Sequence, residues 1–358
     1  MCREIPGDMQ GGGGRVRMRI LLIMDPGIPV PPTLYGGHER LVSLFAEEYQ
    51  KLGHEVTLLA GPDSHCSGKT VTFGTNDLGR SKQVRFKEAR FVWKYLHRNR
   101  DNFDLVHNFG RLIYLLPILN SPLKKIMTYG RPVAQGGIKI VTSLPNHHLI
   151  FTACSDNCVA TGNIKGHWET VYNAIDFSQY TLNNKVGADA PLIFLGRLDR
   201  IKGAHTAIEA AKATNNQLVI AGNISDTEED QAYFKTVIEP QIDGTQIKYV
   251  GPLNDAEKNS RLGHAKALLF PIEWDEPFGM VMIEAMACGT PVIAFRRGSV
   301  PEVVENGITG FIVDNAAGMQ QKIAEIDAVD RSLCRKIAME RFNVGVIARN
   351  YLQLFEGK

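Results

Sequence analysis

Long hydrophobic runs are missing from this 358-residue sequence. No apolar stretch approaches the roughly 20 residues that a membrane-spanning helix requires. The first residues, MCREIPGDMQGGGGRVRM, lack the apolar core of a signal peptide, and their consecutive glycines favour a flexible leader over residues 1–17. We therefore expect a cytoplasmic protein and leave open a peripheral location at the inner membrane surface.

Charge of one sign is not in excess. Lys and Arg together number 40 and Asp and Glu 38, so the net charge is +2. This balance gives no support for a protein dedicated to nucleic acids or other polyanions. Among the six cysteines only Cys154 and Cys158 are close in sequence, and no second pair stands at metal-binding spacing. We expect free thiols rather than a zinc site.

Motifs that bind phosphate or metal through a fixed spacing are absent as well. The turn at 31–40, PPTLYGGHER, lacks the GxGxxG spacing of dinucleotide-binding proteins and the GxxxxGK[ST] spacing of a P-loop. No Asp-x-Asp occurs anywhere in the chain. The sequence therefore implies no cofactor and no metal site.

The chain does have a regular alternation of strand-like and helix-like segments. In the first half, short apolar runs predict buried strands at 19–25, 55–60, 103–109 and 149–155, with a less regular one at 139–145. Periodic apolar residues predict helices at 36–53 and 85–99. After about residue 185 the pattern begins again, with strands predicted at 192–198, 217–223, 248–253, 267–273, 291–295 and 310–314. The helices predicted there cover 203–214, 230–242, 255–265 and 279–289, and two more fill the tail at 331–358.

Strands that alternate with helices of this length predict parallel sheets with right-handed crossovers. Two such series predict an α/β fold of two doubly wound, Rossmann-like domains that face each other across a cleft. We place the N-terminal domain at 18–180, the C-terminal domain at 181–340 and a final helix at 341–358. The boundary lies in 172–191, which is rich in Asn, Asp and Gly.

Several residues near predicted strand ends could bind an anion in such a cleft. Arg197 and Lys202 stand just before a predicted helix, whose first N–H groups and positive end favour a phosphate. Gly36 and Gly37 follow the first strand and would let backbone N–H groups approach a ligand. His107 lies near the end of the strand at 103–109, and we expect it to point into the cleft.

Two carboxylates lie in the otherwise apolar stretch EWDEPFGMVMIEAMACGTPVIAF at 273–295. Glu276 precedes the helix-breaking Pro-Phe-Gly, and Glu284 stands on the predicted helix. A carboxylate on an apolar helix is costly to bury unless it is hydrogen-bonded, and sugar hydroxyls are suitable donors. A ligand with hydroxyls at both ends and a diphosphate in the middle would use all these groups, as a nucleotide sugar does.

Taken in order, these segments resemble the retaining glycosyltransferases of family 4, the GT-B-fold glycosyl transferases of group 1. GRLDRIKG, EPFGMVMIE, AMACGTPVIA and GSVPEVVENGITGFIV resemble the donor domain of that family. PPTLYGGHERLVSLFAEEYQKLGHEVTLLA, FDLVHNF and VYNAIDFSQY resemble its acceptor domain. The resemblance spans residues 18–358, and its tail is similar to a helix that crosses back to the N-terminal domain.

The resemblance implies a role for each of these positions. Arg197 and Lys202 would bind the donor diphosphate, and Gly36 and Gly37 would lie against it. Glu276 would hold hydroxyls of the transferred sugar. The backbone N–H groups that would help Glu276 belong to Phe278, Gly279 and Met280.

The remaining roles concern the two ends of the donor. The resemblance implies that Glu284 binds the ribose hydroxyls and that His107 sits beside the transferred sugar. The nucleobase would be recognised mostly by backbone near Gly222, Asn223 and Val250. His107, Arg197, Lys202 and Glu276 are thus the expected catalytic residues.

The family resemblance implies transfer of a hexose from a nucleotide-diphosphate sugar, expected to be UDP-linked, with retention of anomeric configuration and without a metal. The acceptor can be a small molecule, a glycan or a lipid-linked sugar, and no nucleic acid is expected. Two alternatives remain: a non-catalytic nucleotide-sugar-binding protein, and a nucleotide-sugar epimerase of related fold. The oligomeric state is not indicated.

This sequence departs from the family pattern in two places. The segment 108–141 is short and lacks the common strand-Thr-x-His pattern, so the resemblance does not define the acceptor pocket. The apolar run LIYLLPIL at 112–119 could line a pocket, touch a membrane or cover a core, and we expect the core. Arg296 and Arg297 replace smaller residues frequent in relatives, and their role is open.

Overall fold

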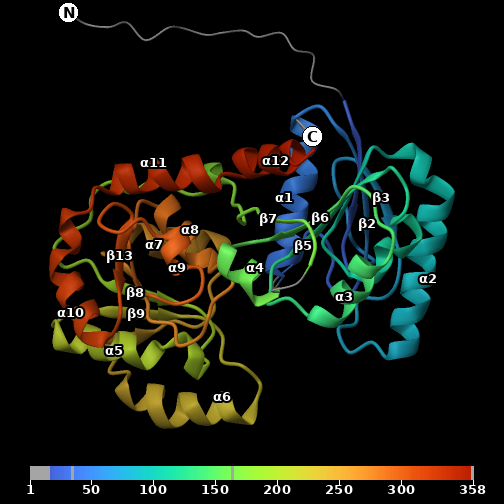
Figure 1. Ribbon diagram of the computed structural model, residues 1–358. Coiled ribbons are helices and arrows are strands. Elements are labelled where there is room, and N and C mark those ends of the chain that lie inside the picture. The colour runs from blue at the N-terminus through green and yellow to red at the C-terminus, as the bar shows by residue number, and fades with distance from the viewer. Residues whose placement is uncertain (1–16, 34–35, 163–164, 356–358) are drawn as a thin grey trace, which may run out of the picture.

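The computed structural model describes residues 17–33, 36–162 and 165–355. Its described part forms two lobes, each a parallel sheet covered by helices (Figure 1). The α/β architecture with two doubly wound sheets is therefore confirmed. Almost all of the predicted leader, 1–17, lies outside the described residues.

The N-terminal lobe holds a seven-stranded sheet in the order β3-β2-β1-β4-β5-β6-β7. Its strands are β1 Arg19–Ile23, β2 Glu55–Ala60, β3 Lys69–Thr72, β4 Leu105–Asn108, β5 Lys124–Tyr129, β6 Leu149–Ala153 and β7 Trp168–Thr170. The helices and 3-10 turns of this lobe are α1 Gly37–Lys51, α2 Lys82–Asn99, η1 Arg100–Asn102, η2 Leu112–Ile118, α3 Gln135–Ser143, α4 Asp156–Gly162 and η3 Phe177–Gln179. Every strand pair in it is parallel.

The C-terminal lobe holds a six-stranded parallel sheet in the order β10-β9-β8-β11-β12-β13. Its strands are β8 Leu192–Leu195, β9 Leu218–Ala221, β10 Ile247–Tyr249, β11 Leu268–Phe270, β12 Val292–Phe295 and β13 Gly310–Val313. The helices and turns are η4 Arg200–Lys202, α5 Ala204–Ala213, α6 Glu228–Tyr233, η5 Phe234–Ile238, η6 Glu239–Gln241, α7 Asp255–His264, α8 Met280–Ala287, α9 Val300–Val303, α10 Ala316–Glu325, η7 Ile326–Ala328, α11 Arg331–Phe342 and α12 Val344–Gln353.

Side-chain alternation along the strands explains how both faces of the N-terminal sheet are buried. In β1, Ile20 and Leu22 pack on the side of α1, whereas Leu21 and Ile23 pack on the side of α2 and η2. Such two-sided burial requires a continuous apolar run, which is what the sequence shows at this strand. The final helix α12 lies beside α1 in this lobe, where the rings of Tyr351 and Phe45 meet edge to face at 5.2 Å (Figure 1).

One predicted strand is wrong. Residues 139–145 do not extend the sheet, since 135–143 form helix α3. Ile138 and Val141, three positions apart, are buried on one side of α3, and Ile140 between them is 62% exposed. That spacing is helical, and the neighbouring β5 supplies the strand instead.

The apolar run 112–119 belongs to the core, as expected. Tyr114, Leu115, Ile118 and Leu119 are buried beneath α2. No helix in the described part of the chain is long and apolar enough to cross a membrane.

Candidate active site

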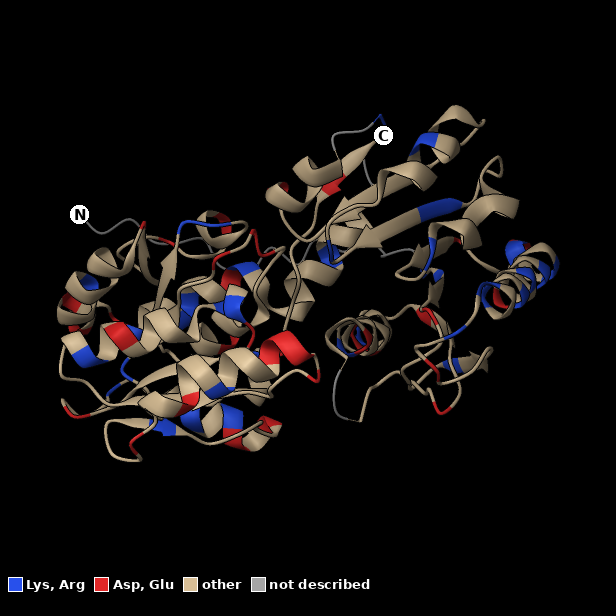
Figure 2. Cartoon of the chain, turned by 90° about the horizontal axis from the view of Figure 1, so that it is seen from below, with Lys and Arg blue, Asp and Glu red and all other residues tan. Residues whose placement is uncertain are grey.

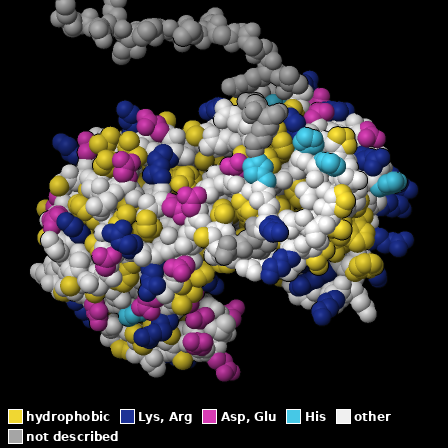
Figure 3. All heavy atoms as spheres, viewed as in Figure 1, with side chains coloured by type: hydrophobic (Ala, Val, Ile, Leu, Met, Phe, Trp, Pro, Cys, Tyr) yellow, Lys and Arg dark blue, Asp and Glu magenta, His cyan; other side chains and the backbone are white. Residues whose placement is uncertain are grey.

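The carboxyl ends of the strands in both sheets meet near a hollow between the lobes, which Figure 3 shows open toward the lower edge of the view. Direct contacts join the lobes at this edge. Ser155, just after β6, donates from Oγ to the carbonyl of Pro277 at 2.7 Å. Arg40 in the first turn of α1 forms an ion pair with Asp255 at the start of α7, at 2.6 Å. The loop that holds Glu276 is therefore fixed against the N-terminal lobe.

Lys202 and Glu276 form an ion pair at the carboxyl ends of β8 and β11, the two strands where the order of the sheet reverses. Their side chains are 15% and 14% exposed. Trp274 donates from Nε1 to the same Glu276 oxygen at 2.9 Å, and the Lys202 ammonium lies 5.0 Å from its ring centroid. An open parallel sheet binds its ligand at such a switch point.

Gly203 makes this position of Lys202 possible. It ends the turn η4 with a φ of 77° and begins α5. A Cβ atom there would lie 2.0 Å from the carbonyl oxygen of Pro271. Only glycine tolerates both the left-handed backbone and this approach, so η4 folds tightly against the segment after β11.

Arg197 lies on the same edge of the sheet, but in the described part of the chain it forms no hydrogen bond or ion pair with Glu276. Its guanidinium pairs with Asp199 at 2.9 Å, and its side chain is 46% exposed. Burial raises the pKa of Asp199, while the charges of Arg197 and Lys202 oppose that rise. Asp199 thus lies between the two cations, and Arg197 is accessible to a ligand.

The segment 277–280 forms the sharp entry to α8. Gly279 has a φ of 76°, and Phe278 is buried. Ser299 fixes the loop, because its Oγ donates to the carbonyl of Phe278 at 2.9 Å and its N–H to that of Glu276 at 3.0 Å. The first N–H groups of a helix have no partner within it, so the turn around Met280 presents donors beside Glu276.

Glu284 lies one turn further along α8 and is held by two groups that the sequence did not single out. Lys258 on α7 contacts its Oε1 at 2.6 Å, and Tyr180 donates to the same atom at 3.2 Å. Burial and then the Glu284 charge raise the pKa of Tyr180. The apolar surroundings of Glu284 in the sequence indicated that it needs hydrogen-bond partners. They did not indicate which residues those partners are.

Gly222 joins the loops that follow β8, β9 and β10. Its φ is 146°, its N–H donates to Gly251 at 2.9 Å, and its carbonyl accepts from the Tyr249 hydroxyl at 2.9 Å. The neighbouring groups are also engaged: the Val250 N–H bonds to Ile220 and the Asn223 carbonyl accepts from Leu198, each at 3.0 Å. These contacts shape the place predicted for a nucleobase.

Replacement of Gly222 by alanine is expected to lower the free energy of unfolding by at least about 3 kcal/mol, because it combines strain with a clash. The new Cβ atom would lie 1.8 Å from the carbonyl oxygen of Gly196. Urea unfolding measures the loss. Gly244→Ala is the matched control, since Gly244 has a φ of 73° and no atom within 4 Å of the added Cβ. Equal losses in the two variants would contradict the contact.

Gly36 and Gly37 start α1, the helix whose Arg40 reaches the other lobe. Gly36 has a φ of 148°, and a Cβ atom on it would lie 2.8 Å from Pro32. Around Gly37 there is open space, since no atom lies within 4 Å of an added Cβ. Gly37 is thus exposed, whereas Gly36 is buried within the turn.

His107 does not point into the cleft, and this expectation is wrong. It is fully buried on the α1 side of the sheet, with Nδ1 3.1 Å from the Tyr49 hydroxyl and Nε2 2.8 Å from Thr128 Oγ1. Burial holds its pKa well below the usual value, so the ring is neutral. The alternation that buries Leu105 on this face buries His107 too.

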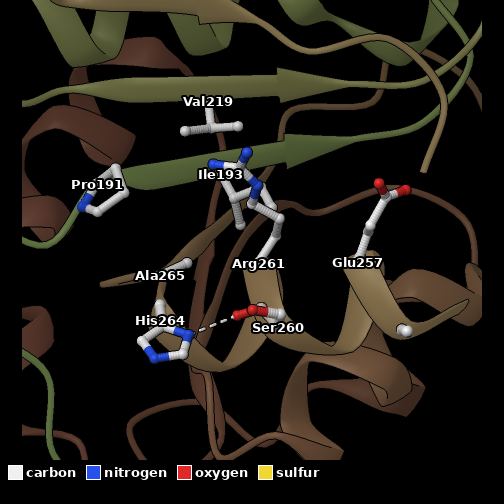
Figure 4. Close-up of a pocket in the computed structure, with 9 residues that line it drawn as sticks. Pro191, Ile193, Val219, Glu257, Ser260, Arg261, His264 and Ala265 are labelled. Atoms are coloured by element: carbon white, nitrogen blue, oxygen red, sulfur yellow. Dashed lines mark hydrogen bonds between the residues drawn. The ribbon is translucent and has the colours of Figure 1, made fainter. Parts of the chain in front are cut away.

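Two further cavities lie apart from Lys202 and Glu276. One, of about 270 Å³ at the carboxyl ends of β12 and β13, is lined by Arg296 and Arg297, and Arg296 pairs there with Asp314 at 3.0 Å. The other, of about 530 Å³, lies between α7 and the amino end of β8, where His264 Nδ1 bonds to the Ser260 carbonyl (Figure 4). It contains none of the predicted site residues. No cluster of three or more His, Cys, Asp or Glu suited to a metal occurs among the described residues.

Two doubly wound parallel sheets whose carboxyl ends face a shared hollow define the GT-B class of fold. The match to the family model Glycosyl transferases group 1 covers residues 183–332. The putative glycosyltransferase YtcC of Bacillus subtilis (strain 168) is 30% identical over 345 residues, which cover 83% of this chain and 80% of YtcC. The chain belongs to the Glycosyl transferases group 1 family and is a glycosyltransferase.

Solved structures agree in fold. AviGT4, a glycosyltransferase involved in avilamycin A biosynthesis, has a TM-score of 0.69 at 23% identity, covering 95% of this chain and 99% of its own. Anabaena Alr3699/HepE, solved with UDP and glucose, has a TM-score of 0.69 at 20% identity, covering 96% and 100%. A shorter alignment, 26% identical, joins this chain to an uncharacterised 41.2 kDa protein in the cps region of Klebsiella pneumoniae and spans 46% of each.

Proposed function

We propose that this glycosyltransferase moves a hexose from a UDP-sugar to an acceptor held by the N-terminal lobe, with retention of configuration and without a metal. The observation that carries the proposal is the Lys202–Glu276 pair at the switch point of the C-terminal sheet, beside the start of α8. A structural neighbour solved with UDP and glucose supports the choice of donor.

Departure of UDP places growing negative charge on the diphosphate. Lys202, the accessible Arg197 and the helix start at Met280 supply positive charge and N–H donors at fixed positions, which stabilise that charge without reorganisation. Glu276 accepts hydrogen bonds from hydroxyls of the hexose, and Glu284 accepts hydrogen bonds from those of the ribose. The acceptor hydroxyl attacks the anomeric carbon from the face that the diphosphate leaves and passes its proton to the departing phosphate oxygen. The configuration is therefore kept, and no carboxylate becomes covalently attached.

Melting temperatures with a panel of nucleotide sugars test this donor site. UDP-glucose or UDP-N-acetylglucosamine is expected to stabilise the protein by about 2.7 kcal/mol at a hundredfold excess over the dissociation constant, and GDP-mannose much less. The shift is expected to be unchanged by EDTA and smaller in Lys202→Ala. A stabilising sugar whose effect is as large in Lys202→Ala as in the unaltered protein, or vanishes with EDTA, would contradict the proposed site.

Two alternatives predict different behaviour in the same protein. A non-catalytic binder would show the thermal shift but no release of UDP with any acceptor. An epimerase would change the sugar of the donor without an acceptor, and a chromatographic separation of the two sugars would detect it. Lys202, Glu276 and Glu284 are all present in the structure, which favours the transferase.

A further inference from the structure

Another cavity, of about 410 Å³, lies in the N-terminal lobe at the carboxyl ends of β1, β4 and β5. β1 and β4 are the strands at which the order of this sheet reverses, so the cavity occupies the same kind of place as the donor site in the other lobe. The next strand along, β6, ends at Ala153, and Ser155 just after it bonds to the Pro277 carbonyl in the loop of Glu276. The cavity therefore lies on the edge of the sheet that contacts the other lobe.

Arginines from four separate segments line this cavity: Arg80, Arg85, Arg111 and Arg131. Two of them are neutralised within the protein. Asp25 pairs with Arg80 and with Arg111, each at 3.1 Å, and Arg80 also pairs with the buried Glu88 at 2.9 Å. The charges of these two cations and two carboxylates cancel, and their ion pairs hold the four side chains in place at the base of the cavity.

The other two arginines are free to meet a ligand. Arg85 in the first turn of α2 and Arg131 just after β5 have exposed side chains, and neither forms an ion pair among the described residues. The charge of Arg131 does act on Glu39 of α1, where it opposes the rise that burial gives the pKa of that carboxyl. α2 adds no compensating charge, because its one carboxylate is the buried Glu88. Lys and Arg predominate along this helix, at the right of Figure 2. The cavity thus has an excess of positive charge.

His38 forms part of the inner wall. Its Nε2 is buried and has no hydrogen-bond partner in the described part of the chain. It points at Gly130, where an added Cβ atom would lie 2.1 Å from Nε2. Burial, and then the charge of Arg131, lower the pKa of His38 to about 4, so the ring is neutral. Gly130 closes this nitrogen off, so the neutral ring shapes the inner wall and adds no charge to the cavity.

We infer that this cavity binds the acceptor and that the acceptor carries an anionic group, a phosphate or a carboxylate, bound by Arg131 and Arg85. The planar guanidinium of an arginine binds such groups through two parallel hydrogen bonds, and two exposed arginines at the cavity mouth could each bind the anion in this way. This inference rests on the proposed function, since it names the acceptor class of the same reaction.

Calorimetric titration of the full chain saturated with UDP tests the inference, because UDP keeps the probe out of the donor site. Glucose 6-phosphate is expected to bind at least tenfold more tightly than glucose. Arg131→Ala is expected to raise the dissociation constant of glucose 6-phosphate by about tenfold to a hundredfold, the effect of losing one charged hydrogen-bonding partner. Arg131→Lys should retain part of the affinity. Arg90→Ala, an exposed arginine of α2 outside the cavity, is the matched control and should change nothing.

Sedimentation with phosphatidylcholine vesicles, with or without phosphatidylinositol, separates the two sources of the anion. Binding only to the phosphatidylinositol vesicles, lost in Arg131→Ala, assigns a lipid headgroup. Binding of glucose 6-phosphate lost in the same variant assigns a water-soluble anion. If UDP binds and neither probe depends on Arg131, the inference is overturned while the donor site stands. Absence of UDP binding would instead refute the proposed function.

Discussion

Lys202→Ala is expected to lower kcat by about a hundredfold to a thousandfold, the usual effect of removing one preorganised group that stabilises charge in the transition state. Its ammonium is held by Glu276 and lies near the Trp274 ring, so it is in place before the donor binds. Steady-state release of UDP measures the change. We expect kcat to fall more than KM rises, because the charge on the leaving diphosphate grows during the reaction.

Lys212→Ala serves as the control for this variant. Lys212 lies near the end of α5, the helix that follows Lys202, and within the described part of the chain it bonds to Gln241 at 3.1 Å. The Lys212→Ala substitution removes one positive charge from the same lobe and leaves the carboxyl ends of the strands unchanged. Turnover within a few-fold of the unaltered enzyme in Lys202→Ala would sink the assigned role, and equal losses in both variants would point to long-range charge instead.

The paired sheets were predictable because parallel strands buried on both faces require apolar runs. The strands that the sequence did not reveal are short or carry charge. β5 begins with two lysines, and Lys125 is fully buried there, with Nζ donating to the carbonyls of Ser121 at 2.9 Å and Leu123 at 2.6 Å. Burial lowers the pKa of Lys125 to about 8. Local carbonyls, invisible in a sequence pattern, let a lysine enter a core strand.

The residues proposed to bind the donor were easier to predict from the sequence than those proposed to bind the acceptor. Lys202, Glu276 and Glu284 stand in segments with a recognisable order, and the structure places each at the facing edge of the C-terminal sheet or on α8. His107 was misplaced because its position near a strand end says nothing about which face it occupies. His38 and Arg131 meet only through the fold, at Gly130, and no spacing in the sequence joins them.

Glu276→Gln is expected to reduce kcat by about a hundredfold or more, for two reasons that act together. The amide offers one acceptor oxygen where the carboxylate offers two, so hexose hydroxyls lose a charged partner. It also leaves the largely buried Lys202 without its counter-charge, and breaking a buried ion pair from one side costs about 3–5 kcal/mol. Thermal unfolding of the variant separates the second effect from the first.

Glu284→Gln gives the decisive comparison, because Glu284 is also a largely buried carboxylate paired with a lysine, Lys258 at 2.6 Å. It contacts the ribose in our proposal, far from the reacting bond, so its loss should raise KM for the donor with little change in kcat. Lys202→Ala combined with Glu276→Gln should cost less than the product of the single losses, since the pair acts as a unit. Additive losses, or a kcat effect as large in Glu284→Gln, would show that Glu276 acts by folding alone.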